Sequence, residues 1–216
     1  MKKVFFTLLL LSVVFACKDE KKSNQSNTEL IEEKEAPKEV LTALPVSNDI
    51  STFSDVSVSF SESTETYLGE AAFLISRTES DSKSSYAQTR KIKVEYAELY
   101  RASIIVKKGD LGNLFGLRIQ GDYPDRVDAV FDLENGTVNG VKKTRDFLEE
   151  SANIEKLTNG WYKCSVTAEI VADEVVVFFG STIGDKDIDA WTVKNEEICN
   201  AYIVPSSITL EKVTFE

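Results

Sequence analysis

From about residue 55 to the end of the chain, apolar and polar residues alternate with a period of two. This period is typical of β-strands with one buried face. The alternating segments are short and separated by turn signals such as Gly121–Pro124 and Asn135–Gly136. They are Val56–Phe60, Ala71–Ile75, Ile92–Val94, Tyr100–Val106, Phe115–Ile119, Val127–Leu133, Tyr162–Ile170 and Ile203–Phe215. We therefore expect an all-β fold, a two-sheet antiparallel sandwich of about nine or ten strands.

Two segments depart from the alternation. Val175–Phe179 is apolar on both sides, which predicts a strand that is central or covered on both faces. Residues 144–151 form the one stretch in which we expect a short helix.

The N-terminus has the composition of a secretory signal peptide at residues 1–16. Lys2–Lys3 precede a short apolar run from Val4 to Phe15, and the small residue Ala16 follows. The sequence V-F-A-C resembles the lipobox of bacterial lipoproteins. That resemblance implies that Cys17 becomes the lipidated first residue and anchors the protein to the membrane.

Residues 17–54 are rich in Lys, Glu, Ser and Asn, so we expect a disordered tether there, followed by a single domain at 55–216. Lys18–Asp19–Glu20 resembles the export tag of lipoproteins displayed outside the outer membrane, which implies surface display. The alternative is that these charges only begin the linker and that the protein stays in the periplasm.

Charge and composition exclude several classes of function. The formal net charge is −11, or −13 once Lys2 and Lys3 are removed, which argues against nucleic acid as a partner. The chain has no His, which excludes His-based triads and His-ligated zinc. Carboxylate pairs drawn from Asp122, Asp125, Asp128 and Glu134 have no spacing that predicts a catalytic cleft. We do not expect an enzyme.

Two cysteines remain beside Cys17. An oxidising compartment permits a Cys164–Cys199 disulfide. Cys164 equally suits a small buried apolar position, because it alternates with Tyr162 and Val166.

Three segments together resemble a known group of domains: LYRASIIVKKGD, AVFDLENGTVNG and ANIEKLTNGWYKCSVTAEI. They are similar to the jelly-roll domains, related to carbohydrate-binding modules, of phage tail proteins and of bacterial surface and secreted proteins. The matching residues are Val106–Lys107, Phe131–Leu133, Gly136–Val138 and Asn159–Tyr162. The resemblance implies a jelly roll over residues 55–216 and, more loosely, glycan binding.

Sugar recognition needs an aromatic face and planar polar groups. Trp191, in a charged loop, is the aromatic residue that we expect to be exposed, and Tyr123, beside Pro124 and Arg126, is the second candidate. The alternative is that Trp191 folds back as a lid.

Strand parity predicts a basic sheet face. It places Lys93, Arg101, Arg118 and Gln120 opposite the apolar positions. Such a face would attract an acidic polysaccharide. The alternative is an ordinary solvated sheet surface.

Asp185, Asp187 and Asp189 alternate as hard-cation ligands do. Domains of the resembled group carry a structural Ca²⁺ in some cases, whereas a solvated acidic loop explains the same pattern. We expect no other cofactor.

The sequence as a whole predicts a non-catalytic surface lipoprotein of the bacterial outer membrane that binds a glycan. One alternative is a structural or adhesive accessory that docks an envelope protein. A weaker alternative is a polysaccharide-degrading enzyme.

Overall fold

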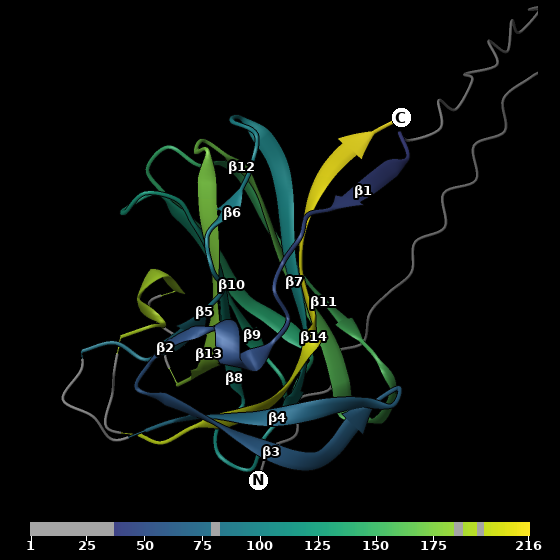
Figure 1. The fold of residues 1–216 in the computed structure, drawn as a ribbon, viewed down its shortest axis with the longest axis vertical. Helices are drawn as coiled ribbons and strands as arrows, with labels where there is room; N and C mark the ends of the chain where they lie inside the picture. Colours follow the sequence, from purple (N-terminus) through teal and green to yellow (C-terminus); the bar gives the residue numbers. More distant parts are fainter. Residues whose placement is uncertain (1–36, 79–82, 184–187, 194–196) are drawn as a thin grey trace, which may run out of the picture. The chain divides into compact units, whose positions relative to one another are not determined.

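The computed structural model describes residues 37–78, 83–183, 188–193 and 197–216. It confirms the all-β fold: two antiparallel seven-stranded sheets pack face to face, an arrangement compatible with a jelly roll (Figure 1). The described residues contain short 3₁₀ turns but no α-helix. None of their helices is long and apolar enough to cross a membrane.

One sheet, called sheet A, has the strand order β11-β12-β7-β14-β4-β3, with β1 also paired to β14. The other, sheet B, has the order β10-β9-β8-β13-β5-β2, with β6 also paired to β13. The strands of sheet A are β1 (Glu39–Ala43), β3 (Val58–Tyr67), β4 (Glu70–Arg77), β7 (Glu98–Lys108), β11 (Leu148–Lys156), β12 (Trp161–Ile170) and β14 (Asn200–Phe215). The strands of sheet B are β2 (Ser54–Val56), β5 (Tyr86–Gln88), β6 (Ile92–Lys93), β8 (Leu114–Gln120), β9 (Arg126–Asp132), β10 (Thr137–Thr144) and β13 (Glu174–Thr182). The 3₁₀ turns are η1 (Ile50–Thr52), η2 (Thr158–Gly160) and η3 (Ile188–Ala190).

The core lies between the sheets and follows the predicted parity. In β7, Ala102, Ile104 and Val106 are fully buried in one hydrophobic cluster with Phe115 and Ile119 of β8. The apolar strand β13 pairs with β8 on one side and with β5 and β6 on the other, which confirms its predicted central position.

The folded part begins before residue 55. β1 pairs with the last strand, with Glu39 opposite Phe215, and Leu44 and Ile50 pack against the core. The compact unit therefore runs from Pro37 to Glu216 and includes residues 37–54, whose polar composition had suggested a tether. The partner of β1 is more than 160 positions away, so no local pattern indicates the pairing.

The helix expected at 144–151 is wrong. β10 ends at Thr144, and β11 begins at Leu148 after a corner in which Arg145 has φ of 62° and Phe147 is buried. The corner carries the chain from sheet B to sheet A, and burial of Phe147 fixes it there. The described residues also form more strands than the nine or ten expected, because β1, β2, β5 and β11 are too short or too polar to alternate clearly.

Cys164 and Cys199 are both buried and free, so the disulfide that the sequence permits is not formed, and Cys164 takes the alternative role of a small buried residue. Cys164 faces the core from the middle of β12, as a small apolar residue would. Burial raises the pKa of both thiols.

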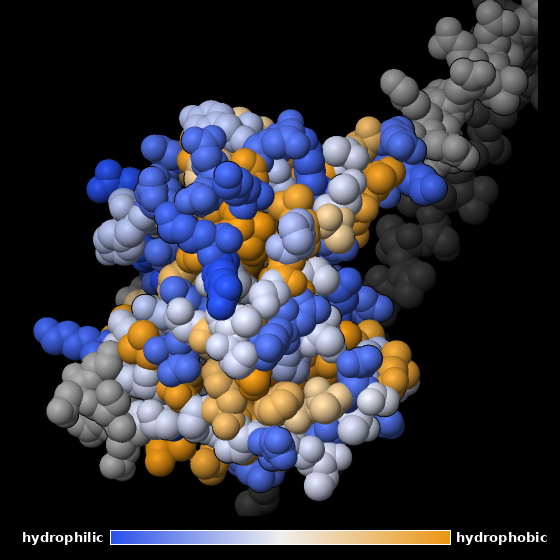
Figure 2. Space-filling model, viewed as in Figure 1, coloured by the Kyte–Doolittle hydropathy of each residue, from blue (hydrophilic) through white to orange (hydrophobic). Residues whose placement is uncertain are grey.

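The surface is unevenly polar. Figure 2 shows hydrophilic side chains gathered over the end of the molecule where β6 lies, and less polar residues over β4.

Candidate functional site

A cleft of about 520 Å³ lies on the outer face of sheet B, the face turned away from the core. Residues from five strands (β5, β8, β9, β10 and β13), from the turn between β8 and β9 and from the segment around η3 (residues 188–193) line it. They are Ser84, Tyr86, Arg118, Gln120, Tyr123, Arg126, Lys142, Phe178, Asp189, Ala190, Thr192 and Val193. Four of these, Tyr123, Arg126, Arg118 and Gln120, are residues that the sequence analysis named as ligand-binding candidates.

Strand alternation explains why these side chains share a face. In β8, Phe115, Leu117 and Ile119 point into the core, so Arg118 and Gln120 point outward. By the same parity Phe178 of β13 points outward, and the centroid of its ring lies 4.7 Å from the centroid of the Tyr86 ring. The cleft thus combines an aromatic pair with planar polar groups.

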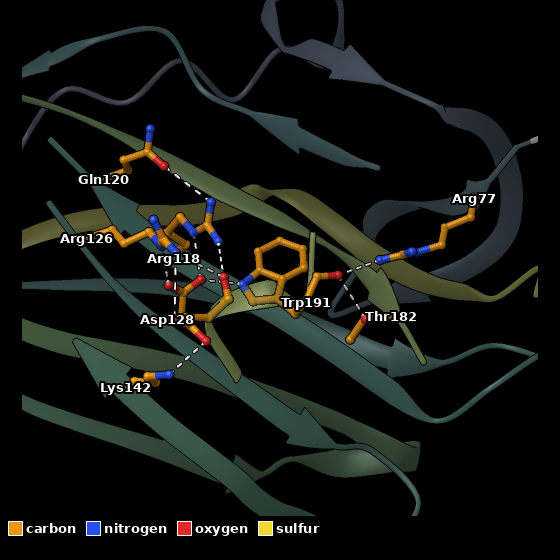
Figure 3. Close-up of polar contacts among 9 residues, drawn as sticks. Arg77, Arg118, Gln120, Arg126, Asp128, Lys142, Thr182 and Trp191 are labelled. Atoms are coloured by element: carbon orange, nitrogen blue, oxygen red, sulfur yellow. Dashed lines mark hydrogen bonds and ion pairs between the residues drawn. The ribbon is translucent and has the colours of Figure 1, made fainter. Parts of the chain in front are cut away.

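A buried carboxylate organises the floor of the cleft. Asp128 of β9 is fully buried, and it accepts hydrogen bonds from Arg118 Nε at 2.6 Å and from Arg126 Nε at 3.0 Å (Figure 3). Burial raises the pKa of Asp128, whereas the two guanidinium groups oppose that rise. Asp128 therefore fixes the positions of both arginines.

Trp191 also bonds to Asp128, and the expectation that it is exposed is wrong. Its side chain is 0% exposed, and its indole Nε1 donates to Asp128 Oδ1 at 2.7 Å. The ring lies on the outer face of sheet B against Gly116, where a Cβ atom would stand 2.2 Å from the indole. The guanidinium of Arg118 lies 5.7 Å from its centroid. Trp191 therefore supports the cleft from beneath, and its ring is not a free surface for a ligand.

The opposite sheet holds Trp191 in place. Arg77, at the end of β4 in sheet A, is buried and donates Nη2 to the carbonyl of Trp191 at 2.6 Å (Figure 3). It also donates to the carbonyl of Ser181 at the end of β13 and to that of Val193. The hydroxyl of Thr182 donates to the Trp191 carbonyl too, at 3.0 Å.

Tyr123 stands at the rim of the cleft. It is 78% exposed, in the turn between β8 and β9, and its peptide bond to Pro124 is cis. The guanidinium of Arg126 lies 5.6 Å from its ring centroid. The cleft is therefore bordered by one exposed aromatic face.

The predicted basic face is not assembled as one surface. Arg101 lies in sheet A, where both terminal nitrogens of its guanidinium bond to Glu39 of β1. Lys93 is exposed on β6 and does not line the cleft. Only Arg118 and Gln120 of that set lie in the cleft, joined by a hydrogen bond of 3.2 Å. Parity correctly gives the outward direction of a side chain but does not say which sheet its strand joins.

Of the candidate metal ligands, Asp185 and Asp187 lie outside the described residues. Asp189 lies in η3, and its carboxylate meets Lys142 Nζ at 2.9 Å and Arg126 Nη2 at 3.8 Å. The hydrogen bond from Lys142 holds the pKa of Asp189 below its ordinary value. Within the described ranges no group of three acidic or thiol side chains is placed to hold a metal ion.

Sequence reasoning missed Tyr86, Phe178, Lys142 and the organising role of Asp128. One signal was available: Gly116 occupies an outward position in an otherwise large-residue strand, and Gly180 does so in β13. Small residues side by side on an outer face indicate that something covers them.

No protein-family model matches this chain, and no curated protein shows significant similarity to it.

Proposed function

We propose that the protein is a non-catalytic binding protein whose cleft on sheet B holds a glycan. The observation that carries the proposal is the composition of the cleft: an exposed tyrosine at the rim, an aromatic pair inside, and the planar polar groups of Arg118, Gln120 and Arg126. Aromatic faces pack against the C–H surface of a sugar ring, and planar polar groups pair with its hydroxyls. The resemblance to domains related to carbohydrate-binding modules favours the same ligand.

The carboxylates of the cleft favour binding over catalysis. Glycoside hydrolysis uses one carboxylic acid and one carboxylate that face each other across the scissile bond. Asp128 is fully buried between two arginines, and Asp189 is paired with Lys142. Neither is disposed to exchange a proton with a sugar.

The cationic lining favours an acidic polysaccharide among glycans. Arg118, Arg126 and Lys142 supply three positive charges, against two negative charges from Asp128 and Asp189. The local charge of +1 contrasts with the net charge of −11 of the chain. We further propose that the protein acts at the bacterial outer membrane, lipid-anchored and facing the exterior. The lipobox-like sequence ending at Cys17 supports the anchor, and the resemblance of Lys18–Asp19–Glu20 to an export tag supports the outward display.

A glycan array probed with the full chain in detergent tests the proposal. We expect binding to acidic polysaccharides, and Tyr123→Ala to weaken it about fivefold through loss of ring contact. Tyr96→Ala is the matched control, because Tyr96 is a comparably exposed tyrosine outside the cleft. Absence of binding to every glycan, or equal loss in both variants, would contradict the proposal.

A further inference from the structure

Asp189 occupies the cationic corner of the cleft with its own carboxylate. One oxygen bonds to Lys142 Nζ at 2.9 Å and the other lies 3.8 Å from Arg126 Nη2. The side chain is 23% exposed, so solvent and solutes reach it from the cleft. A carboxylate group is therefore already bound where the cleft would bind one.

The two carboxylates of the site differ in how firmly they are held. Asp128 is fully buried and accepts hydrogen bonds from Arg118, Arg126 and Trp191. Its displacement would break all three of these bonds. Asp189 lies in the three-residue turn η3, and its side chain is partly exposed, so we expect it to leave its partners more readily than Asp128 does. The carbonyl of Asp189 accepts from Arg118 at 3.1 Å and from Arg126 at 3.3 Å, so the backbone can stay fixed while the side chain moves.

Removal of the Asp189 carboxylate leaves a net charge of +2 on the groups of this site: Arg118, Arg126 and Lys142 against Asp128. A partly shielded cationic site of this kind favours another anion. An ammonium or a neutral group would leave Lys142 and Arg126 without the charge partner that Asp189 now provides.

We propose that the Asp189 side chain is a placeholder for the carboxylate of a uronic acid residue, which displaces it from Lys142 and Arg126 when an acidic polysaccharide binds. This inference rests on the proposed glycan-binding function and specifies the ligand class. Because the incoming carboxylate replaces an internal one, the pairing gained with the ligand is offset by the pairing lost, and Asp189 lowers the affinity for uronates.

The test compares the full chain with Asp189→Asn on three uronate polymers, polygalacturonate, alginate and hyaluronate, and on their methyl-esterified neutral forms. Asp189→Asn should bind the charged polymers about threefold to fivefold more tightly, and the neutral forms unchanged. Lys142→Gln should weaken binding of the charged polymers by a similar factor and leave the neutral forms unchanged. Asp122→Asn is the matched control, since it removes an exposed acid from the turn that carries Tyr123. It should change affinity less than twofold.

The two proposals fail in different ways. Binding of neutral glycans without preference for uronates, or unchanged or weaker uronate binding by Asp189→Asn, overturns the placeholder and leaves glycan binding intact. Equal gains in Asp189→Asn and Asp122→Asn would mean a general charge effect and also overturn it. If neither the unmodified chain nor any variant binds a charged or neutral polymer, both proposals fall.

Discussion

The indole of Trp191 donates a 2.7 Å hydrogen bond to the buried carboxylate of Asp128. This bond joins the segment around η3 to the centre of sheet B, because Asp128 also bonds to Arg118 and Arg126. The lining of the cleft and the segment that covers the sheet therefore share one acceptor group, the Asp128 carboxylate, which contributes to the shape of the cleft.

Asp128→Asn should destabilise the protein by about 3–5 kcal/mol, the usual cost of breaking a buried ion pair. Asparagine has one acceptor oxygen, whereas Asp128 serves three donors. Urea unfolding followed by tryptophan fluorescence measures the change. Asp173→Asn, at an exposed acid before β13, is the control and should stay within about 0.5 kcal/mol. Similar stabilities for both variants would contradict the role assigned to Asp128.

Gly116→Ala should displace the Trp191 indole and lower the free energy of unfolding by about 1–3 kcal/mol through overpacking. A Cβ at Gly116 would stand 2.2 Å from the ring, whereas a Cβ at Gly180 would be in ordinary contact with it at 3.7 Å. Gly180→Ala is therefore the matched control and should be tolerated. A red shift of tryptophan emission in the first variant alone is the expected result, and a shift in neither would show that the indole does not lie on Gly116.

Both buried cysteines should react only after unfolding. Burial raises the pKa of the thiols of Cys164 and Cys199, which keeps them protonated and shielded. Alkylation of the native chain followed by peptide mass analysis should leave both unmodified, and alkylation in urea should modify both. Because they are not bridged, dithiothreitol should not change the melting temperature. A peptide pair linked through Cys164 and Cys199 would refute this.

The ion pair of Asp189 predicts how stability depends on pH. The hydrogen bond from Lys142 lowers the pKa of Asp189 below its ordinary 3.8 in the folded state. The stabilisation that the ionised Asp189 contributes to the folded state is therefore fully present above the ordinary pKa of 3.8. It is lost as pH falls through the lower pKa of the folded state. Asp189→Asn should be about 0.5–1 kcal/mol less stable than the unmodified chain at pH 7, since the pair is partly exposed. That difference should shrink toward pH 3 in urea unfolding, and a difference that widens in acid would have the wrong sign.

The sequence predicts the fold well wherever one buried face repeats every second residue. The buried positions of β7, Ala102, Ile104 and Val106, follow directly from the alternation. β1 escapes prediction because its stabilisation comes from a partner strand at the far end of the chain. The local sequence pattern predicts which side chains face the core. It does not predict which distant segments pair, because pairing depends on the whole fold.

The candidate site could be predicted only in part, for the same reason. Strand parity predicts that Arg118 and Gln120 point outward, and the Gly121–Pro124 turn signal predicts that Tyr123 is exposed. The burial of Trp191 and of Arg118 depends on the segment around η3 returning to sheet B, which no periodicity shows. Gly116 and Gly180 are the only local sign of it that we recognise in the sequence.

Arg77 reaches across the sandwich from sheet A to fix the Trp191 carbonyl that lies under a cleft on sheet B. Anyone who transplants this cleft onto another β-sandwich would have to carry over a residue from the layer behind it. A graft limited to the strands that line the opening would lack the Arg77 hydrogen bonds that hold the carbonyls of Trp191 and Val193.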